Sequence, residues 1–258
     1  MNEAERANIH LRLDPESTYM VRITVLLGEL FPLFYEALTH FMSTEQDNKQ
    51  PSFIQIGKQT FALEAIIADS VEGSCWAESI SLASLVEEAS TLKMGKVLSL
   101  SMEFSSLTTF NRSNKRSRIY GGHSALLPLP SYLLPGLARR WQEIVPPEMA
   151  DLVQRERIEQ YIADNGIIIS DYHLKPHQVH FTTHIQPDFV GMCTYDLRGP
   201  DGQGTEDTLL TVRQQIWLLA RPAFYCGVGY KTAMGLGQAH LLWPRPFMSE
   251  PYPSAKQR

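Results

Sequence analysis

The sequence is poor in cysteine and has no long apolar run. Its three cysteines, Cys75, Cys193 and Cys226, are scattered and form no C-x-x-C pair. This spacing predicts neither a disulfide framework nor a zinc ribbon. No apolar run is long enough to mark a membrane span, and the polar N-terminus, MNEAERANIH, lacks the apolar segment of a secretory signal. We therefore expect a globular, cytoplasmic protein that has no membrane partner.

The chain also lacks the overall positive charge of a general nucleic-acid binder, because its formal net charge is -5. Its positive charge is instead concentrated within residues 104–142, which contain six Lys or Arg and no Asp or Glu. A local basic block on an acidic protein indicates a defined anionic ligand. A solvated loop with a chance cluster of charges is the alternative that composition leaves open. The basic block consists of Arg112, Lys115, Arg116, Arg118, Arg139 and Arg140.

The most distinctive motif is GVGYKTAMGLG at residues 227–237, called the glycine loop below. Glycine tolerates positive φ and the close approach of another backbone. Paired glycines around Lys231 and Thr232 therefore predict a loop that is pressed against an anion such as a phosphate. A glycine-rich helix cap followed by a tight turn is the other interpretation. The glycines of the loop are Gly227, Gly229, Gly235 and Gly237.

The glycine loop does not fit the common nucleotide-binding motifs. A dinucleotide fingerprint needs G-x-G-x-x-G between a strand and a helix, whereas here a predicted helix precedes and a strand follows. A phosphate-binding P-loop needs Gly directly before Lys-Ser or Lys-Thr, and Tyr230 occupies that position. Neither type of nucleotide site is therefore predicted.

The pattern of elements predicts an α+β fold of two tandem ferredoxin-like (RRM-like) halves. The first half has the order βαββαβ, and the second half repeats this order of elements without repeating the sequence. We expect an N-terminal domain of residues 1–118 and a C-terminal domain of residues 119–258. The strand near 97–110 is left open between the two halves. Predicted strands are 19–27, 52–57, 59–68, 97–104, 166–170, 179–185, 189–197 and 238–243, and predicted helices are 32–42, 81–92, 130–144 and 208–225.

Two such units ending in a glycine-rich loop resemble the CRISPR repeat-processing endoribonucleases of the RAMP superfamily. The segments that carry the resemblance are FVGMCTYDL with the later YCGVGYKTAMGLGQAHLL, MEFSSLTTF, LPLPSYLLPGLARRW and CWAESISLASLV. The resemblance implies that the ligand is CRISPR repeat RNA. It also implies cleavage without a metal or other cofactor, by attack of a 2′-OH on the adjacent phosphate. The expected products are a 2′,3′-cyclic phosphate and a 5′-OH.

This chemistry needs an acid–base group, and His40 is the catalytic candidate. It lies eight residues after Pro32 in the predicted first helix, where several members of the family have a catalytic histidine. Glu36, one helical turn earlier, is placed to orient the imidazole. Tyr35 is predicted to assist as a donor or stacker, although it lies on another helix face. A half-exposed helix histidine beside a solvated Glu is the alternative.

Other candidate groups are weaker. His123, beside the basic block, is the second catalytic candidate. The segment after the first helix departs from the family pattern and leaves a second catalytic group unassigned, so Lys49 and Lys58 are positional guesses. His173, His177, His180 and His184 have helix-like metal spacing, but Pro176 and the β-branched neighbours favour a strand, so no metal site is predicted.

For RNA binding, the resemblance implies a phosphate contact from Lys231, with Thr232 as a neutral donor. Backbone N–H groups of Gly229 and Gly235 are expected to add to it. The expected RNA-binding residues are Arg112, Lys115, Arg116, Arg118, Gly227, Gly229, Lys231, Thr232, Gly235 and Gly237.

Two other functions stay open. A non-catalytic RAMP subunit that holds guide RNA in a CRISPR effector complex needs the glycine loop and the basic block but not His40. An unrelated ferredoxin-like module for a small anionic ligand needs no RNA affinity at all. The sequence does not decide between a monomer and a homodimer.

Overall fold

The structure, a computed structural model, describes residues 14–46, 53–56, 59–68, 77–92, 98–112, 123–181, 185–198 and 210–242. For residues 41–46, 111, 112 and 123 only the backbone is described. The chain divides into two compact units, Met1–Leu85 and Val86–Arg258. No helix in these described ranges is long and apolar enough to cross a membrane.

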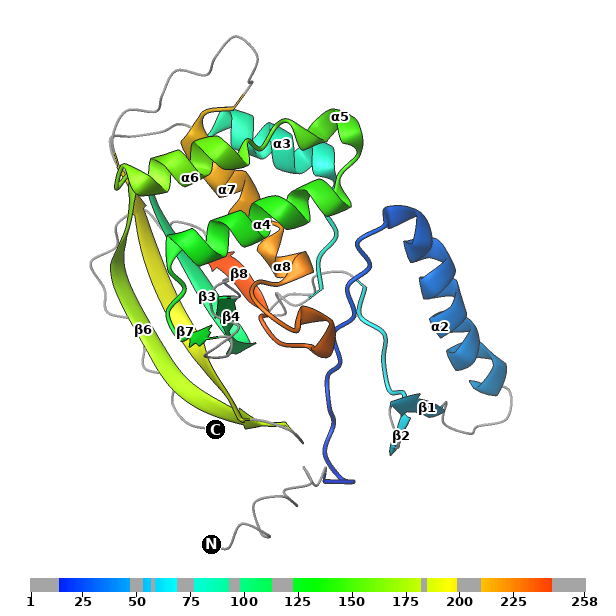
Figure 1. The fold of residues 1–258 in the computed structure, drawn as a ribbon. Coiled ribbons are helices and arrows are strands. Elements are labelled where there is room, and N and C mark those ends of the chain that lie inside the picture. The colour runs from blue at the N-terminus through cyan, green and yellow to red at the C-terminus, as the bar shows by residue number, and fades with distance from the viewer. Residues whose placement is uncertain are drawn as a thin grey trace, which may run out of the picture. The chain divides into compact units, whose positions relative to one another are not determined.

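The first unit contains one long helix and one pair of short strands (Figure 1). The 3₁₀ turn η1 (Gly28–Leu30) leads into α2 (Phe31–Gln46). Pro32 lies in the first turn of α2, where the missing N–H has no intrahelical partner to lose. Strands β1 (Phe53–Ile56) and β2 (Gln59–Ala62) pair antiparallel.

The prediction of a strand at 19–27 is wrong, because residues 18–25 adopt no regular secondary structure. β-branched and apolar residues favour a strand only where a neighbouring strand offers ladder hydrogen bonds and a surface to pack on. In the described part of the first unit, β1 and β2 pair only with each other. The side chains of Met20, Val21 and Ile23 are 70%, 59% and 57% exposed, so they contribute little to a core.

The second unit is built on a four-stranded antiparallel sheet with the order β6-β7-β3-β8. Helix α4 (Pro130–Ile144) connects β3 to β6, and α7 (Val212–Ala220) lies between β7 and β8. The chain order is therefore βαββαβ, and the fold of this unit is ferredoxin-like, as predicted. The strands are β3 (Leu98–Thr108), β6 (Ile167–His180), β7 (Ile185–Leu197) and β8 (Ala239–Leu242).

Strand β3, whose assignment the sequence left open, is the first strand of the second unit. It pairs with β7 on one side and with β8 on the other. The division predicted after residue 118 falls beyond this strand, whereas the compact units divide between Leu85 and Val86. The partners of β3 lie much later in the chain, and strand composition alone carries no information about them.

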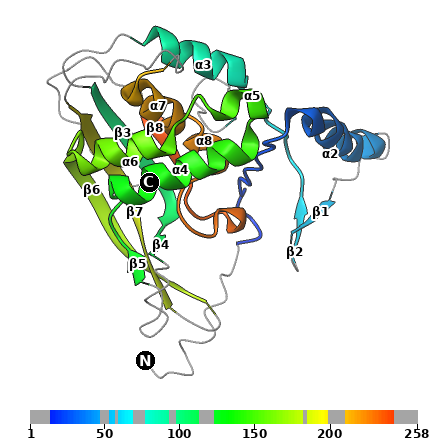
Figure 2. The ribbon, with the colours of Figure 1, turned by 45° about the horizontal axis from the view of Figure 1, so that its top comes forward.

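Helices α4, α6 (Arg155–Ala163) and α7 lie over one face of the sheet, as Figures 1 and 2 show. The short helix α5 (Pro147–Ala150) connects α4 to α6. On β3, the alternating residues Leu100, Met102 and Phe104 are buried under these helices. Helix α4 contributes its own buried stripe of Leu133, Leu134, Leu137, Ala138 and Trp141. The main core of the unit lies between these two surfaces.

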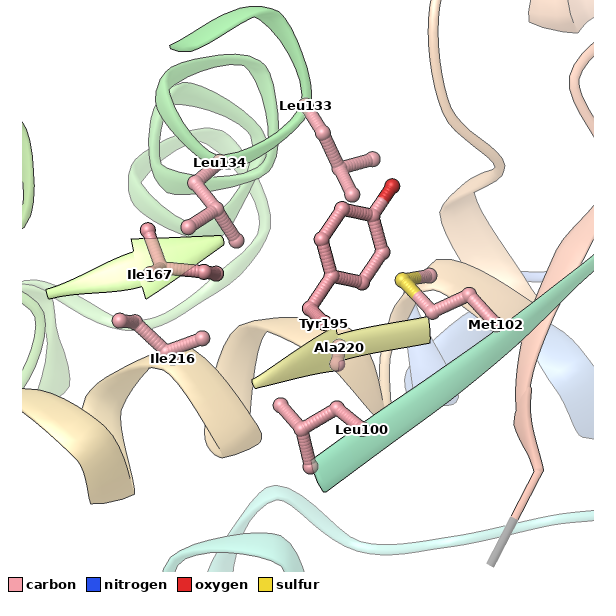
Figure 3. Close-up of a pocket in the computed structure, with 8 residues that line it drawn as sticks. All are labelled: Leu100, Met102, Leu133, Leu134, Ile167, Tyr195, Ile216 and Ala220. Atoms are coloured by element: carbon pink, nitrogen blue, oxygen red, sulfur yellow. The ribbon is translucent and has the colours of Figure 1, made fainter. Parts of the chain in front are cut away.

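A small gap in this core is lined by side chains from the sheet and the helices (Figure 3). Its one polar group is the hydroxyl of Tyr195, which donates to the carbonyl oxygen of Pro128 at 2.6 Å. Burial raises the pKa of Tyr195 well above its usual value. A ligand pocket needs several converging polar groups, so this gap is a feature of packing. Its lining consists of Leu100, Met102, Leu133, Leu134, Ile167, Tyr195, Ile216 and Ala220.

On the other face of the sheet, a polar network is centred on Asp196 of β7. Its carboxylate accepts hydrogen bonds from Ser99 at 2.7 Å, Ser170 at 2.9 Å and Arg198 at 3.1 Å. Burial tends to raise the pKa of Asp196, but the hydrogen bonds outweigh it, so the pKa lies below its usual value. The network therefore connects β3, β6 and β7 through one charged group.

Several predicted elements differ in extent from the structure. The helix expected at 208–225 is divided into α7 and α8 (Ala223–Cys226), with Arg221 and Pro222 between them. Proline has no N–H and its ring crowds the preceding turn, so it ends α7. The strand candidate 166–170 lies almost wholly in a longer strand, β6, which contains Pro176. Of the candidate 179–185, only Val179 and His180 belong to β6, and Ile185 is the first residue of β7. Because β6 is at the edge of the sheet, this proline is tolerated.

Two further elements complete the described chain. Helix α3 (Leu82–Thr91) crosses the division between the units, and its Ser90 carbonyl accepts a hydrogen bond from Gln214 near the start of α7 at 3.1 Å. The strands β4 (Phe110–Arg112) and β5 (His123–Ala125) pair antiparallel. Phe110 stacks against Phe189 of β7 at 6.3 Å between ring centroids, which anchors β4 to the core.

Candidate functional site

The glycine loop connects α8 to β8 in the second unit, and its glycines adopt a left-handed backbone. Gly227, Gly229, Gly235 and Gly237 have φ values of 66°, 77°, 81° and 71°. Residues with a side chain rarely adopt this conformation, which explains the glycines at these four positions. Gly227 ends α8, where its N–H donates to the carbonyl of Ala223 at 2.9 Å. The helix-cap interpretation is therefore correct for Gly227.

The two ends of the glycine loop are held together by their backbones. The N–H of Val228 donates to the carbonyl of Gly237 at 2.7 Å. A Cβ atom at Gly237 would lie 1.8 Å from the carbonyl oxygen of Val228, closer than any two such atoms can approach. Gly237 is therefore required both by its φ and by this contact. We call the Val228–Gly237 contact the neck of the loop.

The loop is also fixed to the last part of β3. Gly237 donates to the carbonyl of Leu107 at 2.9 Å, and Tyr230 donates to the carbonyl of Thr109 at 3.0 Å. The hydroxyl of Ser106 donates to the carbonyl of Gly235 at 2.9 Å. The register of β3 against β7 shifts between Phe104 and Thr108. This irregularity leaves backbone groups of β3 available to the loop, because they are not used in a regular ladder.

Arg140 on α4 holds the loop from the other side. Its guanidinium donates to the carbonyl oxygen of Cys226, and also to that of Gly229 at 3.1 Å. Its neighbour Arg139 instead pairs with Glu143 one turn later, and both of these side chains are largely exposed. The two arginines of the basic block that lie on α4 therefore differ, because Arg140 supports the loop and Arg139 lies on the surface.

Several carbonyl oxygens of the loop region thus accept hydrogen bonds from the protein itself. The guanidinium of Arg140 donates to the carbonyls of Cys226 and Gly229. The Ser106 hydroxyl donates to that of Gly235, and the Val228 N–H donates to that of Gly237. Carbonyl lone pairs repel an anion, so their use inside the protein makes the loop surface more suitable for a phosphate. The N–H of Gly235 donates to the carbonyl of Thr232 at 3.0 Å, so this amide is already used within the loop.

Lys231 is the one residue of the loop other than glycine that has a positive φ, at 59°. Its ammonium nitrogen lies 3.2 Å from the centroid of the Phe181 ring and 5.4 Å from that of the Tyr230 ring. These distances are within the range of a cation–π interaction. Thr232 follows as the first residue of the 3₁₀ turn η3 (Thr232–Met234). The structure therefore brings Lys231 together with two aromatic rings, a grouping that the sequence prediction missed.

His40 and Tyr35 belong to α2 in the first unit. His40 is exposed on the helix surface. Tyr35 is 40% exposed, and its ring stacks on that of Phe31, with centroids 5.8 Å apart. The hydroxyl of Thr39 donates to the carbonyl of Tyr35 at 2.9 Å, within the same helix. Both candidates are therefore on the helix where the sequence predicted them, in a different unit from the glycine loop.

The rest of the basic block is only partly described. Arg112 is the last residue of β4, where it pairs with His123 of β5, and only the backbone of each is described. Lys115, Arg116 and Arg118 lie outside the described residues, as do Lys49 and Lys58. The RNA-binding roles of Arg112, Lys115, Arg116 and Arg118 stay predictions.

The histidines of β6 lie on a strand, as the sequence predicted. His173, His177 and His180 pair with Met192, Asp188 and Ile185 of β7. On a strand, His180 takes the opposite face from His173 and His177. Within the described ranges no three His, Cys, Asp or Glu side chains are grouped to hold a metal ion. His184 lies outside these ranges.

The two described cysteines are not activated nucleophiles. Burial raises the pKa of the Cys193 thiol to about 11 and also raises that of Cys226. Both thiols are therefore protonated at neutral pH, and a protonated thiol is a weak nucleophile.

The model of the CRISPR-associated endoribonuclease Cas6 family matches residues 102–239, which is more than half of the chain. The chain belongs to the Cas6 family. The matched range begins within β3 and ends at the first residue of β8. It therefore contains α4 with Arg140, the paired strands β6 and β7, and the whole glycine loop.

Solved Cas6 structures share the fold of this chain. The TM-score is 0.59 with the Cas6 (TTHB231) product complex, a protein of Thermus thermophilus, and 0.57 with the Cas6 (TTHA0078) product complex. Both are 22% identical and cover 84% of this chain and 74% of theirs. A Cas6 (TTHA0078) substrate mimic complex gives 0.54 at 20% identity, over 84% and 77% of the two chains. No curated protein matches the sequence.

Proposed function

We propose that this protein is a metal-independent endoribonuclease that cleaves CRISPR precursor RNA within its repeats to give mature guide RNA. The observation that carries the proposal is the Cas6 family match across residues 102–239. That range contains the glycine loop together with the groups of β3 and α4 that fix it. The solved relatives named as product and substrate mimic complexes are consistent with an RNA ligand.

The proposed reaction is an internal transesterification. The 2′-oxygen of one nucleotide forms a bond to the adjacent phosphorus while the bond from phosphorus to the 5′-oxygen of the next nucleotide breaks. A base takes the proton of the 2′-OH, and an acid gives a proton to the leaving 5′-oxygen. One strand then ends in a 2′,3′-cyclic phosphate and the other begins with a 5′-OH.

In this proposal His40 supplies the acid–base group. Imidazole changes its charge near neutral pH and serves as either base or acid. Its exposed position on α2 leaves it accessible to RNA. Tyr35, whose ring is partly exposed, assists by hydrogen bonding or stacking. One positioned group of this kind accelerates a reaction by roughly 10²–10⁴-fold.

The glycine loop positions the RNA in this proposal. Lys231 and Thr232 contact the phosphate backbone, and the glycines allow the RNA to approach the loop closely. Several carbonyl oxygens of the loop region accept hydrogen bonds from the protein, so these lone pairs are turned away from an approaching anion. The basic residues Arg112, Lys115, Arg116 and Arg118 add contacts to the RNA backbone.

A second function, that of a non-catalytic RAMP subunit that holds guide RNA in a CRISPR effector complex, is favoured by one observation. The family match includes the glycine loop but begins after residue 101, so it does not include His40. A protein that only binds RNA would need the matched region alone.

The experiment that tests the proposal is incubation of the protein with the repeat RNA of its neighbouring CRISPR array in excess EDTA. We expect cleavage at one position in each repeat. The upstream product should resist 3′-end labelling until its cyclic phosphate is opened and removed, and the downstream product should accept a 5′-phosphate directly. A matched RNA with a 2′-deoxy nucleotide at the cleavage position should bind equally well and stay intact.

The outcomes separate the two functions. Tight binding without cleavage would support the non-catalytic subunit. Loss of cleavage in EDTA would contradict metal independence, and cleavage of the 2′-deoxy RNA would contradict attack by the 2′-OH. Absence of any RNA affinity would contradict both functions.

A further inference from the structure

The glycine loop carries a group of three side chains that no motif assigned. The ammonium of Lys231 lies against the face of Phe181, with its nitrogen 3.2 Å from the ring centroid. The ring of Tyr230, the preceding residue, has its centroid 5.4 Å from the same nitrogen. All three residues belong to the second unit. Phe181 follows directly after the last residue of β6, and the other two lie in the loop.

The exposure of this group differs from residue to residue. Tyr230 is 44% exposed, whereas Phe181 and Lys231 are half-buried. Phe181 therefore serves as the support of the ammonium, and Tyr230 presents aromatic surface to the solvent. Met234, at the end of the 3₁₀ turn, is 63% exposed and adds apolar surface nearby in sequence. A Cβ atom at Gly235 would meet nothing within 4 Å, so the loop is open at this point.

Backbone hydrogen bonds fix the main chain at Tyr230 and Lys231. The N–H of Tyr230 donates to the carbonyl of Thr109 at 3.0 Å, and the carbonyl of Lys231 accepts from Met234 at 2.9 Å. Lys231 keeps a left-handed conformation, which is unfavourable for a residue with a side chain. A strained conformation persists only where the surrounding contacts fix it. The main chain that carries the aromatic ring and the cation is therefore preorganised.

We infer that Tyr230, Lys231 and Phe181 form a platform for one unpaired nucleotide of the RNA. This inference rests on the proposed function, which makes RNA the ligand. The base stacks on the ring of Tyr230, and the ammonium of Lys231, supported by Phe181, donates to the adjacent phosphate. Aromatic side chains beside a cation are the usual surface for single-stranded nucleic acid.

The platform specifies a feature of the substrate. Both faces of a base within a duplex are covered by its stacked neighbours, so a paired base cannot also stack on Tyr230. The nucleotide that binds beside the loop is therefore unpaired and splayed out of any helix, as in the sequence-specific recognition of single-stranded RNA segments. Because every base has an aromatic face, this contact selects an unpaired position and does not select one base.

Fluorescence of 2-aminopurine tests the inference, because the emission of this base analogue falls when it stacks on an aromatic ring. A repeat RNA carries a single 2-aminopurine at each unpaired position in turn, with a 2′-deoxy nucleotide at the cleavage position. We expect quenching on binding of the protein at one unpaired position. The same analogue placed in a fully paired segment should not respond.

Three variants of Tyr230 separate stacking from folding. Tyr230→Phe keeps the ring and should keep both the quenching and the affinity. Tyr230→Ala and Tyr230→Leu should lose the quenching and weaken RNA binding by about 5- to 150-fold, the range measured for one base–aromatic stack. Tyr172→Ala is the matched control, because Tyr172 on β6 is also exposed, at 62%, and lies outside the platform. It should leave the quenching and the affinity unchanged.

The dependence of binding on salt separates the cation from the ring. Loss of one phosphate contact on single-stranded RNA reduces the slope of log K against log salt by about 0.7. Lys231→Met should reduce the slope by this amount, whereas Tyr230→Ala should weaken binding equally at every salt concentration. Phe181→Leu should weaken binding in the same direction as Lys231→Met, because the ammonium loses its support.

Two results would overturn the inference and leave the proposed function intact. One is quenching by Tyr230→Leu equal to that of the unchanged protein. The other is an equal loss of affinity in Tyr172→Ala and Tyr230→Ala. The proposed function fails separately, if the unchanged protein does not cleave unmodified repeat RNA. The platform is supported in that case too if Tyr230→Ala abolishes the quenching and Tyr172→Ala does not.

Discussion

The guanidinium of Arg140 donates to the carbonyl oxygen of Gly229 at 3.1 Å, and to that of Cys226 as well. One side chain on α4 therefore fixes two carbonyls on either side of Gly227. The neighbouring Arg139 instead makes an exposed pair with Glu143. Two consecutive arginines of the basic block thus have different roles, although their sequence context is the same.

We predict that Arg140→Ala lowers both stability and RNA affinity. Loss of a charged donor from two partly buried carbonyls costs about 1–3 kcal/mol in the free energy of unfolding. Arg139→Ala is the matched control and should change that free energy by less than about 0.5 kcal/mol, because exposed pairs one turn apart contribute little. Urea unfolding and RNA titration of both variants measure the difference, and equal effects would contradict the role of Arg140. Added guanidinium ion should partly restore RNA affinity to Arg140→Ala.

Substitutions in the neck should differ from substitutions at the open part of the loop. Gly237→Ala and Gly235→Ala both place a Cβ at positive φ, which costs about 1 kcal/mol or more. At Gly237 the new Cβ also lies 1.8 Å from the carbonyl of Val228, so the neck must open. At Gly235 it meets nothing within 4 Å. We expect Gly237→Ala to be the less stable variant and the weaker RNA binder, as measured by thermal unfolding and titration.

His40→Ala should abolish cleavage and leave RNA binding nearly unchanged. The expected loss of rate is roughly 10²–10⁴-fold, the contribution of one acid–base group. His173→Ala is the control, because it removes another exposed histidine, on β6 in the second unit. Single-turnover cleavage and RNA titration distinguish the two steps. Full cleavage by His40→Ala would contradict the catalytic role of this residue.

The stability contribution of Asp196 should depend on pH. Its pKa is lowered in the folded state, so its hydrogen bonds stabilise the protein fully above the unfolded pKa of about 3.9. The contribution is lost as the pH falls toward the lowered folded-state pKa. We predict that Asp196→Asn reduces the free energy of unfolding by about 1–2 kcal/mol at pH 7. The difference from the unchanged protein should shrink below about pH 4 in urea unfolding, and a difference that persists there would contradict this assignment.

Reversal of charge at Arg112, Lys115, Arg116 and Arg118 should weaken RNA binding. Each lost phosphate contact on duplex RNA should reduce the salt slope of log K by an amount close to the 0.9 known for duplex DNA. Arg139→Glu provides a control on α4, because Arg139 lies on the surface beside Glu143. Binding constants measured over a series of salt concentrations give the slopes. Unchanged salt slopes in the four variants would show that these residues do not contact RNA and would favour the interpretation as a solvated loop.

Local patterns were enough to predict most helices and the position of the loop. Pro32 and Pro130 mark the starts of α2 and α4, and alternating residues mark β3. These signals are carried by neighbouring residues and do not need the rest of the fold. The loop was recognised for the same reason, because its positive φ values and close backbone contacts require glycine at particular positions.

Features that depend on distant partners were not predictable in this way. Strand β3 belongs to the second unit because β7 and β8 pair with it. Residues 19–27 have the composition of a strand but no described ladder partner. Nothing in the pair Arg139-Arg140 shows which guanidinium turns toward the loop. Phe181 contacts Lys231 across about 50 positions, a relation that only the folded chain provides.

The neck between Val228 and Gly237 makes the tip of the glycine loop a replaceable module. Because both ends are fixed to each other and to β3, changes between them need not disturb α8 or β8. The entropy of closing a loop rises slowly, by about 0.6 kcal/mol for each doubling of its length. Residues inserted near Met234 would therefore add little loop-closure entropy, and their main cost would be the hydrogen bonds of Met234 and Gly235. The tip is thus a place where new ligand preferences could be introduced while the neck stays closed.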